Sequence, residues 1–530
     1  MSNIPSNILS NTGATSSWAV TSLLDGDRTI RRSTSAENIF QFRPFVMQCP
    51  QVSTENDYQN NTMESQYMNC YPLYYYGNAV YSSAYPFIYG TLSSTMFQQM
   101  QGINNLHISR NYMTRSRSDD SIFRKSQPNE RDLKILSKRY WEQVNKYDEK
   151  PGFQFKLMSY NVLAQDLIEQ HLYLYKYHNQ KTLEWKIRWR NLYEEISKIL
   201  PDIMCLQEVQ ESHLTDYYNK FEFLGYKGLY KKRTGMTTDG CAIFYQADKV
   251  NLVEYETVEF FQPYVGVLNR DNVAIIAKFS PKNQPENEFI VATTHLLYNP
   301  KRTDVRLAQT QLLVAEIERL SFSRSQKSDQ YLPIIITGDF NTKPDSAVYE
   351  YITRGVLTYK HLGERCLDHS NTTRHGKVLV PKELEITDNS QHAILVKKRD
   401  DKETISRTEE SALIKLHNSE KTVQKTTEEV VKNSELFCSG TISHLFALRS
   451  VYDHGHHENS EGSTYHDEWI SVDYIFYSGK REGREIKDHR LELLSRYRLP
   501  RKSELGSMKI PNKILGSDHL CLVANFKLNF

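Results

Sequence analysis

The stretch LPIIITGDFNTKPDS, residues 332–346, decides the fold. It begins as an apolar strand, IIIT, and runs directly into GDFN at 338–341. Side chains two apart on a strand share a face, so we expect Asp339 and Asn341 to project together while Phe340 turns into the core. An Asx-rich turn that closes the strand is the alternative, because Asp and Asn bond their own backbone well. The choice depends on whether other strands end in the same way.

The composition excludes several classes of protein. The formal net charge is +2 with 25% charged residues, so any contact with nucleic acid must come from a local groove. The seven cysteines are scattered and never spaced as C-x-x-C, which argues against a disulfide framework and a structural zinc site. The start lacks a secretory pattern, and no apolar run approaches the roughly 18 residues of a membrane span. We expect a soluble protein of the cytoplasm, the nucleus or both, with no membrane partner.

Composition divides the chain into two parts. Residues 1–130 are rich in Ser, Asn and Tyr and show no sustained period, which predicts a disordered N-terminal region. This region is either an inert tail or a segment that binds partners or forms condensates. Residues 131–530 form the expected folded domain. Within it, residues 397–435 are almost entirely polar and predict a disordered or helical insertion looped out from the domain.

Strands and helices alternate in the first half of the domain, and strands follow one another at short spacing elsewhere. Helices are expected at 132–144, 182–200, 304–320 and from 346 onward, and strands at 153–161, 202–209, 240–245, 272–279, 288–296, 334–339, 469–478 and 516–528. Pro201 ends the second of these helices. This pattern predicts a layered α/β protein with mixed sheets.

Polar side chains stand beside six of the apolar strands. They are Asn161, Glu208, His295, Asp339 with Asn341, Asp473, and Asp518 with His519. A single acid after a strand is usually a solvated loop residue, and a single histidine is usually structural. Six repetitions of one arrangement favour a shared site.

The residue types fit one kind of chemistry. Carboxylates and amides are hard oxygen ligands that suit Mg²⁺, with Mn²⁺ as an alternative. Histidines can stabilise oxygens that gain charge in a transition state, and an Asp can fix the tautomer of a His. The set contains no Ser–His–Asp pattern, no Gly-rich phosphate loop and no cysteine nucleophile. It predicts metal-assisted attack of water on phosphorus.

Six motifs in this order resemble the endonuclease/exonuclease/phosphatase superfamily: SYN (159–161), LQE (206–208), TTH (293–295), GDFN (338–341), VDYIF (472–476) and SDH (517–519). The fold that this resemblance implies is a four-layered α/β sandwich, with two mixed β-sheets packed face to face and helices outside. RYWE (139–142), CLQEVQESH (205–213) and THLLYNPKRTDVRLAQ (294–309) are similar to the Angel branch, which lies near the deadenylases.

The resemblance implies roles for the acids and amides. Glu208 is the expected main Mg²⁺ ligand, with Asn161 nearby on the metal or the phosphate. Asp339 is expected to orient or deprotonate the attacking water, and Asn341 to hold that water or a phosphate oxygen. Asp518 completes the acidic cluster around the metal.

The resemblance implies a different role for the histidines. His295 and His519 are expected to stabilise charge on the phosphoryl oxygens, with Asp473 orienting His519. All positions of the superfamily pattern are filled, which is typical of an active enzyme.

The Angel resemblance implies an RNA phosphoesterase that removes 2′,3′-cyclic phosphates from the 3′ ends of RNA such as mRNA or tRNA. The alternatives are a 3′→5′ exoribonuclease of the deadenylase type and a scaffold that binds translation factors. Tyr298, Asn299 and Arg302 are candidates for contacting the terminal nucleotides, by position and type alone. The basic stretch 478–505 either lies beside the RNA backbone or is a solvated loop. The oligomeric state is not predicted.

Overall fold

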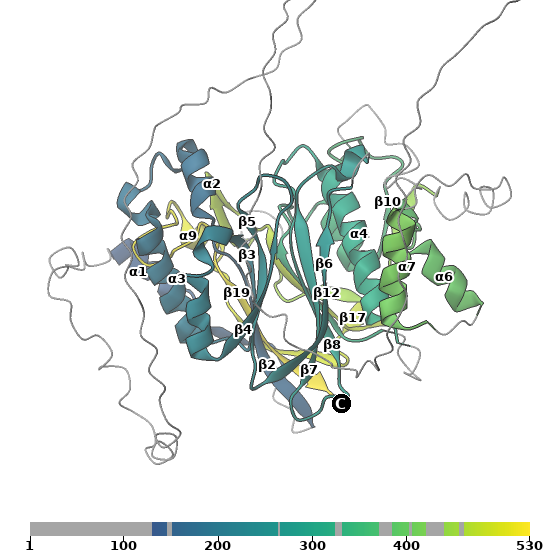
Figure 1. Cartoon of the computed structure of the whole chain (residues 1–530). Helices are drawn as coiled ribbons and strands as arrows, with labels where there is room; N and C mark the ends of the chain where they lie inside the picture. Colours follow the sequence, from purple (N-terminus) through teal and green to yellow (C-terminus); the bar gives the residue numbers. More distant parts are fainter. Residues whose placement is uncertain are drawn as a thin grey trace, which may run out of the picture. The chain divides into compact units, whose positions relative to one another are not determined.

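Two large β-sheets face each other in this computed structural model, and helices cover their outer faces (Figure 1). The structure describes residues 130–145, 151–262, 265–323, 331–369, 384–401, 405–419, 439–454 and 460–530. The prediction for the N-terminal region lies outside the described residues. The predicted sandwich of two mixed sheets with helices outside is confirmed.

The first sheet has seven strands in the order β1-β18-β19-β2-β3-β5-β4. β2 and β3 run parallel, and the other neighbours are antiparallel. Its strands are β1 Trp141–Gln143, β2 Gly152–Asn161, β3 Ile203–Gln210, β4 Tyr226–Lys232, β5 Asp239–Gln246, β18 Leu491–Tyr497 and β19 Leu522–Asn529. The one parallel pair brings the carboxyl ends of β2 and β3 to the same edge.

The second sheet has six strands in the order β12-β15-β9-β8-β7-β6. Here β8 and β9 are the parallel pair. Its strands are β6 Val250–Glu259, β7 Val273–Pro281, β8 Phe289–His295, β9 Ile334–Asp339, β12 Leu448–Ser450 and β15 Asp473–Ser478. Three two-stranded sheets accompany it: β10 Val356–Thr358 with β11 Thr441–Ser443, β13 Thr464–His466 with β14 Glu468–Ile470, and β16 Lys480–Glu482 with β17 Glu485–Lys487.

Helices connect and cover the sheets (Figure 1). The α-helices are α1 Glu130–Ser137, α2 Gln165–Gln170, α3 Trp185–Ile199, α4 Thr303–Ser321, α5 Ala347–Arg354, α6 Ala393–Asp400, α7 Arg407–Ser419 and α9 Lys502–Leu505. The 3₁₀ turns are η1 Leu172–Tyr175, η2 Gln180–Leu183, η3 Glu211–His213, η4 Tyr218–Leu224 and η5 Gly266–Leu268. Among the described residues, none of these helices is both long and apolar enough to cross a membrane.

The two sheets are held together by an apolar layer between them. Leu157 and Ile203 of the first sheet and Ile275, Val291 and Ile335 of the second belong to this layer, and all five are fully buried. Each such side chain contributes on the order of 2 kcal/mol when it is removed from water. Further buried clusters join α3 to the first sheet and α4 to the second. The continuous apolar runs of β7, β8 and β9 follow from burial on both faces.

Two sequence-based predictions differ from the structure. The first helix ends at Ser137, and the chain then enters β1 at the edge of the first sheet. The basic stretch 478–505 is not a solvated loop, because it contains the β16–β17 hairpin, the buried strand β18 and α9. In β18 the buried Leu491 and Leu493 alternate with Glu492, and the many charged residues of the surrounding stretch obscured this strand pattern in the sequence.

The polar insertion is helical where it is described, and it packs against the domain. Arg407 of α7 donates to Glu254 of β6 (2.6 Å) and to the Leu320 carbonyl of α4 (2.5 Å). Ser411 donates to Glu256 (3.0 Å), and Ile414 is buried. The expectation of a segment looped out from the domain is therefore wrong for α7, which lies beside α4 (Figure 1). Residues 402–404 and 420–438 lie outside the described residues.

One buried ion pair predicts how stability depends on pH. The Glu316 carboxylate accepts hydrogen bonds from His392 Nε2 (2.8 Å) and Arg319 Nε (2.9 Å). Burial alone would raise the pKa of Glu316, but His392 and Arg319 lower it to about 2. Because the folded-state pKa lies below the unfolded value, the stabilisation is present above about pH 4.3 and is lost as the pH falls through the folded-state pKa.

We therefore expect Glu316→Gln to lower the free energy of unfolding by about 2 kcal/mol at neutral pH and by less near pH 3. Urea unfolding at both pH values measures this difference. The matched control is Glu350→Gln, which removes an exposed pair with Arg354 and should change stability by less than about 0.5 kcal/mol. A deficit for Glu316→Gln that does not shrink on acidification would contradict the assignment.

Candidate active site

The predicted polar residues meet at one edge of both sheets. Asn161 ends β2, Glu208 lies near the end of β3, His295 ends β8 and Asp339 ends β9. Asp473 begins β15, which pairs antiparallel with β9 so that Asp473 lies opposite Asp339. Each parallel pair carries its side chains to the same end, and the facing of the two sheets brings both ends together. All five residues are buried.

Asn161 joins carboxylates from the two sheets. Its Nδ2 donates to Glu208 Oε1 (2.9 Å) and to Asp339 Oδ2 (3.0 Å). Its Oδ1 accepts from the Leu163 backbone N–H (3.0 Å), and the Ala164 N–H donates to Glu208 Oε2 (3.0 Å). The amide therefore holds the two carboxylates at fixed positions, and we name these three residues, Asn161, Glu208 and Asp339, the carboxylate hub.

Glu208 reaches the carboxylate hub through an irregular backbone. Its φ is +58°, and the register of β3 against β5 shifts between Leu206 and Val209. A non-glycine residue in the left-handed region costs about 1 kcal/mol or more, and a bulge redirects a side chain from its strand. The strained, bulged backbone at Glu208 therefore directs its side chain toward Asn161, a direction that a regular strand would not give.

The GDFN motif ends β9 with an Asx turn and also directs one oxygen of Asp339 toward Asn161. Asp339 Oδ1 accepts from the Asn341 N–H (2.9 Å), which is the Asx turn weighed as the alternative, while Oδ2 faces Asn161. Asn341 has φ +49° and donates through Nδ2 to the Leu296 carbonyl (2.9 Å), so it does not continue the strand face of Asp339 as expected. Phe340 is fully buried, as predicted. Gly338 is required because a Cβ there would lie 2.0 Å from the Thr294 carbonyl oxygen.

His519 and Asp473 form a buried ion pair. His519 Nδ1 lies 2.9 Å from Asp473 Oδ1, and the hydroxyls of Ser463 and Thr464 each donate to Asp473 Oδ2 at 2.6 Å. Burial would raise the pKa of Asp473, but His519 and the two hydroxyls keep it below the ordinary value. Burial would lower the pKa of His519, but Asp473 and Asp518 raise it well above the ordinary value. The predicted orientation of His519 by Asp473 is thus seen in the geometry, and His519 is a cation.

His295 has the opposite protonation state. Burial, together with the nearby Arg233 cation, lowers the pKa of His295 to about 4, so the ring is neutral at physiological pH. Its Nε2 lies 3.6 Å from Asp339 Oδ2, and its Nδ1 has no hydrogen-bond partner among the described residues. One neutral and one cationic imidazole therefore flank the same carboxylate, because His519 Nε2 lies 3.8 Å from Asp339 Oδ2.

The pKa of the Asp339 carboxyl group is raised above its ordinary value. Burial, followed by the charge of Asp473, raises the pKa of Asp339 to about 7. A carboxyl group with a pKa near neutrality is suited to accept a proton from water at physiological pH. The arrangement therefore supplies a proton acceptor beside a fixed cation.

Two groups of side chains have the spacing of a metal site. The first group consists of Glu208, His295 and Asp339, and the second of Asp339, Asp473 and His519. Within each group the ligand atoms lie within 4.8 Å of one another. The first group fits a divalent cation better, because two carboxylates converge there and His295 is neutral. In the second group His519 is a cation that already neutralises Asp473.

Asp518 lies beside the cluster and belongs to neither group. Its Oδ2 accepts from the Tyr175 hydroxyl (2.7 Å), and its Oδ1 lies 3.7 Å from His519 Nε2. The geometry thus makes Asp518 a further negative neighbour of His519, next to the acids expected to hold the metal.

The three proposed substrate contacts differ in their availability. The Tyr298 ring is 56% exposed, and its hydroxyl lies 2.8 Å from His466 Nε2. Asn299 closes its own turn with the Lys301 N–H (3.0 Å). Arg302 forms two hydrogen bonds with Asp304, both 2.9 Å long. Tyr298 is therefore presented to solvent, whereas the side chains of Asn299 and Arg302 are used within the loop.

Several neighbours of the site were missed in the sequence. Tyr175 ends the short 3₁₀ turn η1, Ser463 precedes the three-residue strand β13 and Thr464 begins it, so no periodic pattern points to them. Arg233 and Asp239 form a buried ion pair, with Arg233 Nε 3.1 Å from Asp239 Oδ1. Arg233 directly follows β4 and Asp239 begins β5, so the antiparallel pairing of these two strands brings the two residues together.

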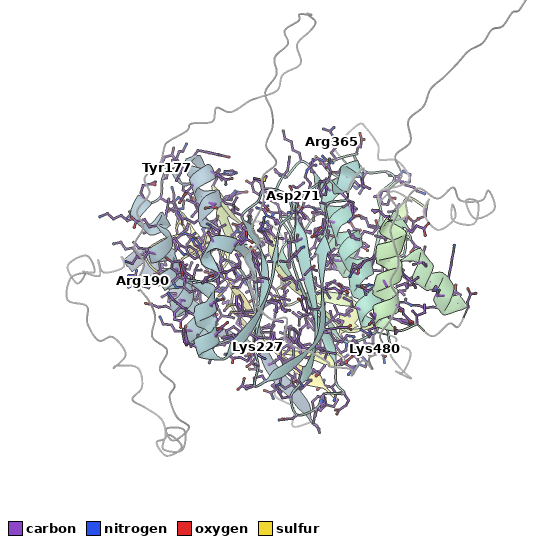
Figure 2. The ribbon with its side chains drawn as sticks, viewed as in Figure 1. Tyr177, Arg190, Lys227, Asp271, Arg365 and Lys480 are labelled. Atoms are coloured by element: carbon purple, nitrogen blue, oxygen red, sulfur yellow. The ribbon has the colours of Figure 1, made fainter. Side chains whose placement is uncertain are left out.

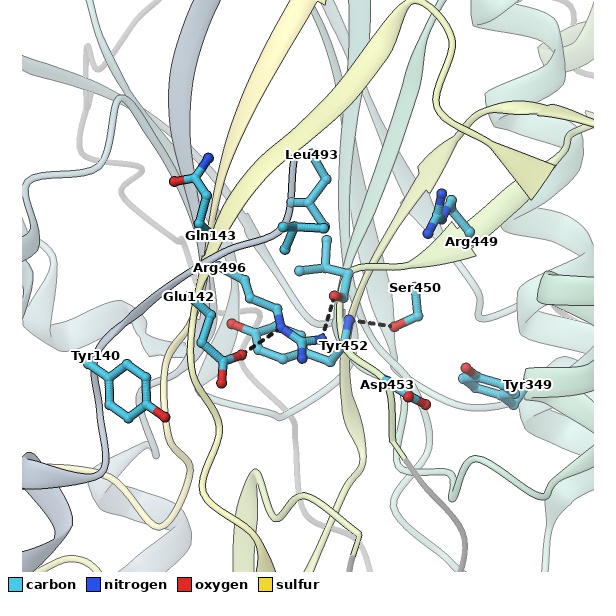
Figure 3. Close-up of a pocket in the computed structure, with 12 residues that line it drawn as sticks. Tyr140, Glu142, Gln143, Tyr349, Arg449, Ser450, Tyr452, Asp453, Leu493 and Arg496 are labelled. Carbon is cyan, nitrogen blue, oxygen red and sulfur yellow. Dashed lines mark hydrogen bonds and ion pairs between the residues drawn. The ribbon is translucent and has the colours of Figure 1, made fainter. Parts of the chain in front are cut away.

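A cavity of about 830 Å³ lies elsewhere, between the edge strand β1, its neighbour β18 and the region of β12 and the segment after it (Figure 3). Tyr140, Arg449, Asp453 and Tyr452 line it, and Arg496 there donates to Glu142 (3.0 Å) and to the Val451 carbonyl (3.1 Å). None of the residues of the carboxylate hub and neither catalytic histidine lines this cavity. It is therefore separate from the candidate active site.

Comparisons with known proteins show which family the chain belongs to. The model of the Endonuclease/Exonuclease/phosphatase family matches residues 158–519. Protein angel homolog 2 of Homo sapiens is 34% identical over 406 residues, which cover 72% of this chain and 70% of that protein. Protein angel of Drosophila melanogaster is 35% identical over 378 residues, covering 70% of this chain and 80% of that protein.

A solved structure is similar in both sequence and fold. The crystal structure of ANGEL2, a 2′,3′-cyclic phosphatase, in complex with adenosine-2′,3′-vanadate has 34% sequence identity and a TM-score of 0.59. The match covers 74% of this chain and 99% of that chain. The chain belongs to the endonuclease/exonuclease/phosphatase family and, within it, to the Angel proteins.

Proposed function

We propose that this protein is a metal-dependent phosphoric ester hydrolase that removes 2′,3′-cyclic phosphates from RNA 3′ ends. The observation that carries the proposal is the carboxylate hub lying between one neutral and one cationic histidine. The similarity to ANGEL2, a 2′,3′-cyclic phosphatase, supports this choice of substrate.

The chain's own residues divide the work. Removal of the cyclic phosphate takes two hydrolyses: one water opens the ring to a phosphomonoester, and a second water releases inorganic phosphate. In each, Asp339 accepts the proton of the attacking water, because its pKa is raised to about 7 and its Oδ1 is held by the Asn341 N–H. His519 offers its Nε2–H to the phosphoryl oxygens or to the leaving oxygen, because Asp473 holds Nδ1. Asn161 positions both carboxylates through its amide nitrogen.

The carboxylate hub also fits a divalent cation, which we propose to be Mg²⁺ with Mn²⁺ as an alternative. Glu208 would hold this ion, with Asp339 beside it to act on the attacking water, and the ion would supply positive charge to the phosphoryl oxygens when bound. Dialysis against EDTA is expected to abolish hydrolysis, and Mg²⁺ to restore it. Full activity after EDTA treatment, with metal content checked by mass spectrometry, would contradict the metal site.

A paired assay tests the substrate. The purified protein receives either an RNA ending in a 2′,3′-cyclic phosphate or a 3′-hydroxyl RNA with a poly(A) tail, with Asp339→Ala as the inactive control. Conversion of the first RNA to a free-hydroxyl end without shortening is the expected result. Progressive shortening of the second RNA would instead establish a 3′→5′ exoribonuclease, and inactivity on both would overturn the proposal.

The N-terminal region and the location in the cell belong to the same proposal. Residues 1–130 recruit translation or RNA-decay factors, and the protein acts on RNA in the cytoplasm, the nucleus or both. Purification of the full chain and of a chain beginning at residue 131 compares the factors retained by each. Equal recovery by the two chains would remove the recruiting role.

A further inference from the structure

Exposed tyrosines gather near the candidate active site. Among the described residues, the three most exposed tyrosines are Tyr177 (71%), Tyr173 (68%) and Tyr298 (56%). Tyr177 and Asp271 lie at the same end of the molecule, and Asp271 precedes Asn272, which donates to the His295 carbonyl (Figure 2). Exposed aromatic side chains that gather in one region mark a candidate interaction surface, whereas scattered ones are ordinary.

The turn that carries two of these tyrosines is fixed to the catalytic cluster. The Tyr175 hydroxyl donates to Asp518 Oδ2 (2.7 Å), and the Tyr175 side chain is buried. His178 Nε2 donates to the Ile510 carbonyl (3.0 Å), which places the segment around residue 510 against the same turn. Tyr173 and Tyr177 therefore point outward from a turn whose middle residue contacts a neighbour of His519.

Two lysines surround the Tyr177 ring. Lys176 Nζ lies 4.7 Å and Lys509 Nζ 4.6 Å from the ring centroid. Within the described part of the chain, neither ammonium has a carboxylate at ion-pair distance, since the ion pairs found there involve other lysines. We name Lys176, Tyr177 and Lys509 the tyrosine–lysine surface. It offers one flat ring and two unneutralised cations.

We propose that the tyrosine–lysine surface binds the nucleotides on the 5′ side of the reacting RNA end. This inference rests on the proposed function. Single-stranded RNA is held by stacking of bases on aromatic rings and by cations along the phosphates, and this surface has both elements. A base that stacks on Tyr177 displaces an ammonium from the ring toward a phosphate, and base stacking is the stronger of the two contacts at an exposed site.

Two links connect the catalytic cluster with the turn that carries this surface: the Tyr175–Asp518 hydrogen bond and the closeness of Tyr173 to Tyr298. Tyr298 follows the strand that ends in His295, and burial raises its pKa, with the Tyr173 hydroxyl adding to that rise. Tyr173 therefore lies near Tyr298, and it belongs to the same turn region of the chain as Tyr177. The terminal nucleotide beside Tyr298 would be followed by its 5′ neighbours along Tyr173 and the tyrosine–lysine surface.

The test compares two substrates of different length. Adenosine 2′,3′-cyclic phosphate reaches only the catalytic cluster, whereas an oligoribonucleotide with a 2′,3′-cyclic phosphate end also reaches the surface. The triple variant Lys176→Ala/Tyr177→Ala/Lys509→Ala is expected to raise KM for the oligoribonucleotide about tenfold and to leave kcat and the mononucleotide reaction unchanged. The slope of log KM against log salt is expected to fall by about 1.4, from the loss of two phosphate contacts.

The matched control replaces the same residue types away from the site. Lys227 and Lys480 lie at the opposite end of the molecule from Tyr177 (Figure 2), and Tyr255 is exposed on the edge strand β6. Lys227→Ala/Tyr255→Ala/Lys480→Ala is expected to keep the KM of the unaltered protein for both substrates. An equal KM for the oligoribonucleotide in the unaltered protein and the Lys176/Tyr177/Lys509 variant would overturn the inference and would turn attention to a protein partner. Absence of mononucleotide hydrolysis in the unaltered protein would overturn the proposed function instead.

Discussion

Asp339→Asn is expected to reduce kcat for the cyclic-phosphate RNA by about a thousandfold or more, because it removes the proton acceptor and one charge of the metal site together. An asparagine keeps the shape and still accepts the Asn341 N–H through its oxygen. It cannot take a proton from water, and its amide nitrogen meets the Asn161 amide that now donates to Asp339. Single-turnover kinetics with saturating enzyme measures the chemical step without product release.

The fold of this variant is expected to survive. The pKa of Asp339 is raised in the folded protein, so the ionised carboxylate opposes folding above its unfolded pKa, and a neutral amide removes that opposition. The variant should therefore unfold at the same temperature as the unaltered protein or higher. The exposed Asp345 in the same loop gives the control Asp345→Asn, which should keep full activity. A loss smaller than tenfold for Asp339→Asn would place the proton acceptor elsewhere.

The second large effect is expected for Asp473→Asn, with a loss of roughly a hundredfold to ten-thousandfold in kcat. Removing the carboxylate that faces an imidazole leaves the ring in the wrong protonation state, and effects of this size follow in comparable sites. Of the charges that raise the pKa of His519, Asp473 contributes the most. The pKa of His519 should therefore fall, and the alkaline limb of the pH–rate profile, which needs protonated His519, should move to lower pH.

Two measurements separate this role from a structural one. An NMR titration of the His519 ring follows its pKa directly in both proteins. Ser463→Ala removes one of the two hydroxyl donors to Asp473 while it keeps the negative charge, so its kcat should fall only about tenfold or less. An alkaline limb that does not move in Asp473→Asn would show that His519 is not the acid of the reaction.

The strand ends of the site could be read from the sequence, because an apolar run that stops at a polar residue is a local signal. Asn161, His295 and Asp339 each end a strand as expected. The left-handed backbone of Glu208 could not be read in this way, since the bulge depends on how β3 pairs with β5. The contact of Tyr175 with Asp518 joins residues 343 positions apart, and only the tertiary fold brings them together.

The same limit explains the errors in the fold. Strand β6 was not among the predicted strands. It lies at the edge of its sheet and alternates polar with apolar residues, so it lacks the continuous apolar run by which the other strands were recognised. The polar character of residues 407–419 indicated solvent, yet Arg407 and Ser411 bind the acids of β6. A charged helix that finds charged partners cannot be told from a solvated one by composition.

Asn161 belongs to one sheet and Asp339 to the other, yet a single amide group bridges them. The catalytic set is complete only while the apolar layer keeps the two sheets in register. A chain in which each sheet has formed but the two sheets have not yet docked would contain every catalytic residue and would still be inactive on RNA. Enzyme activity therefore reports whether the two sheets have docked, and a hydrolase built in this way does not cleave its substrate before folding is complete.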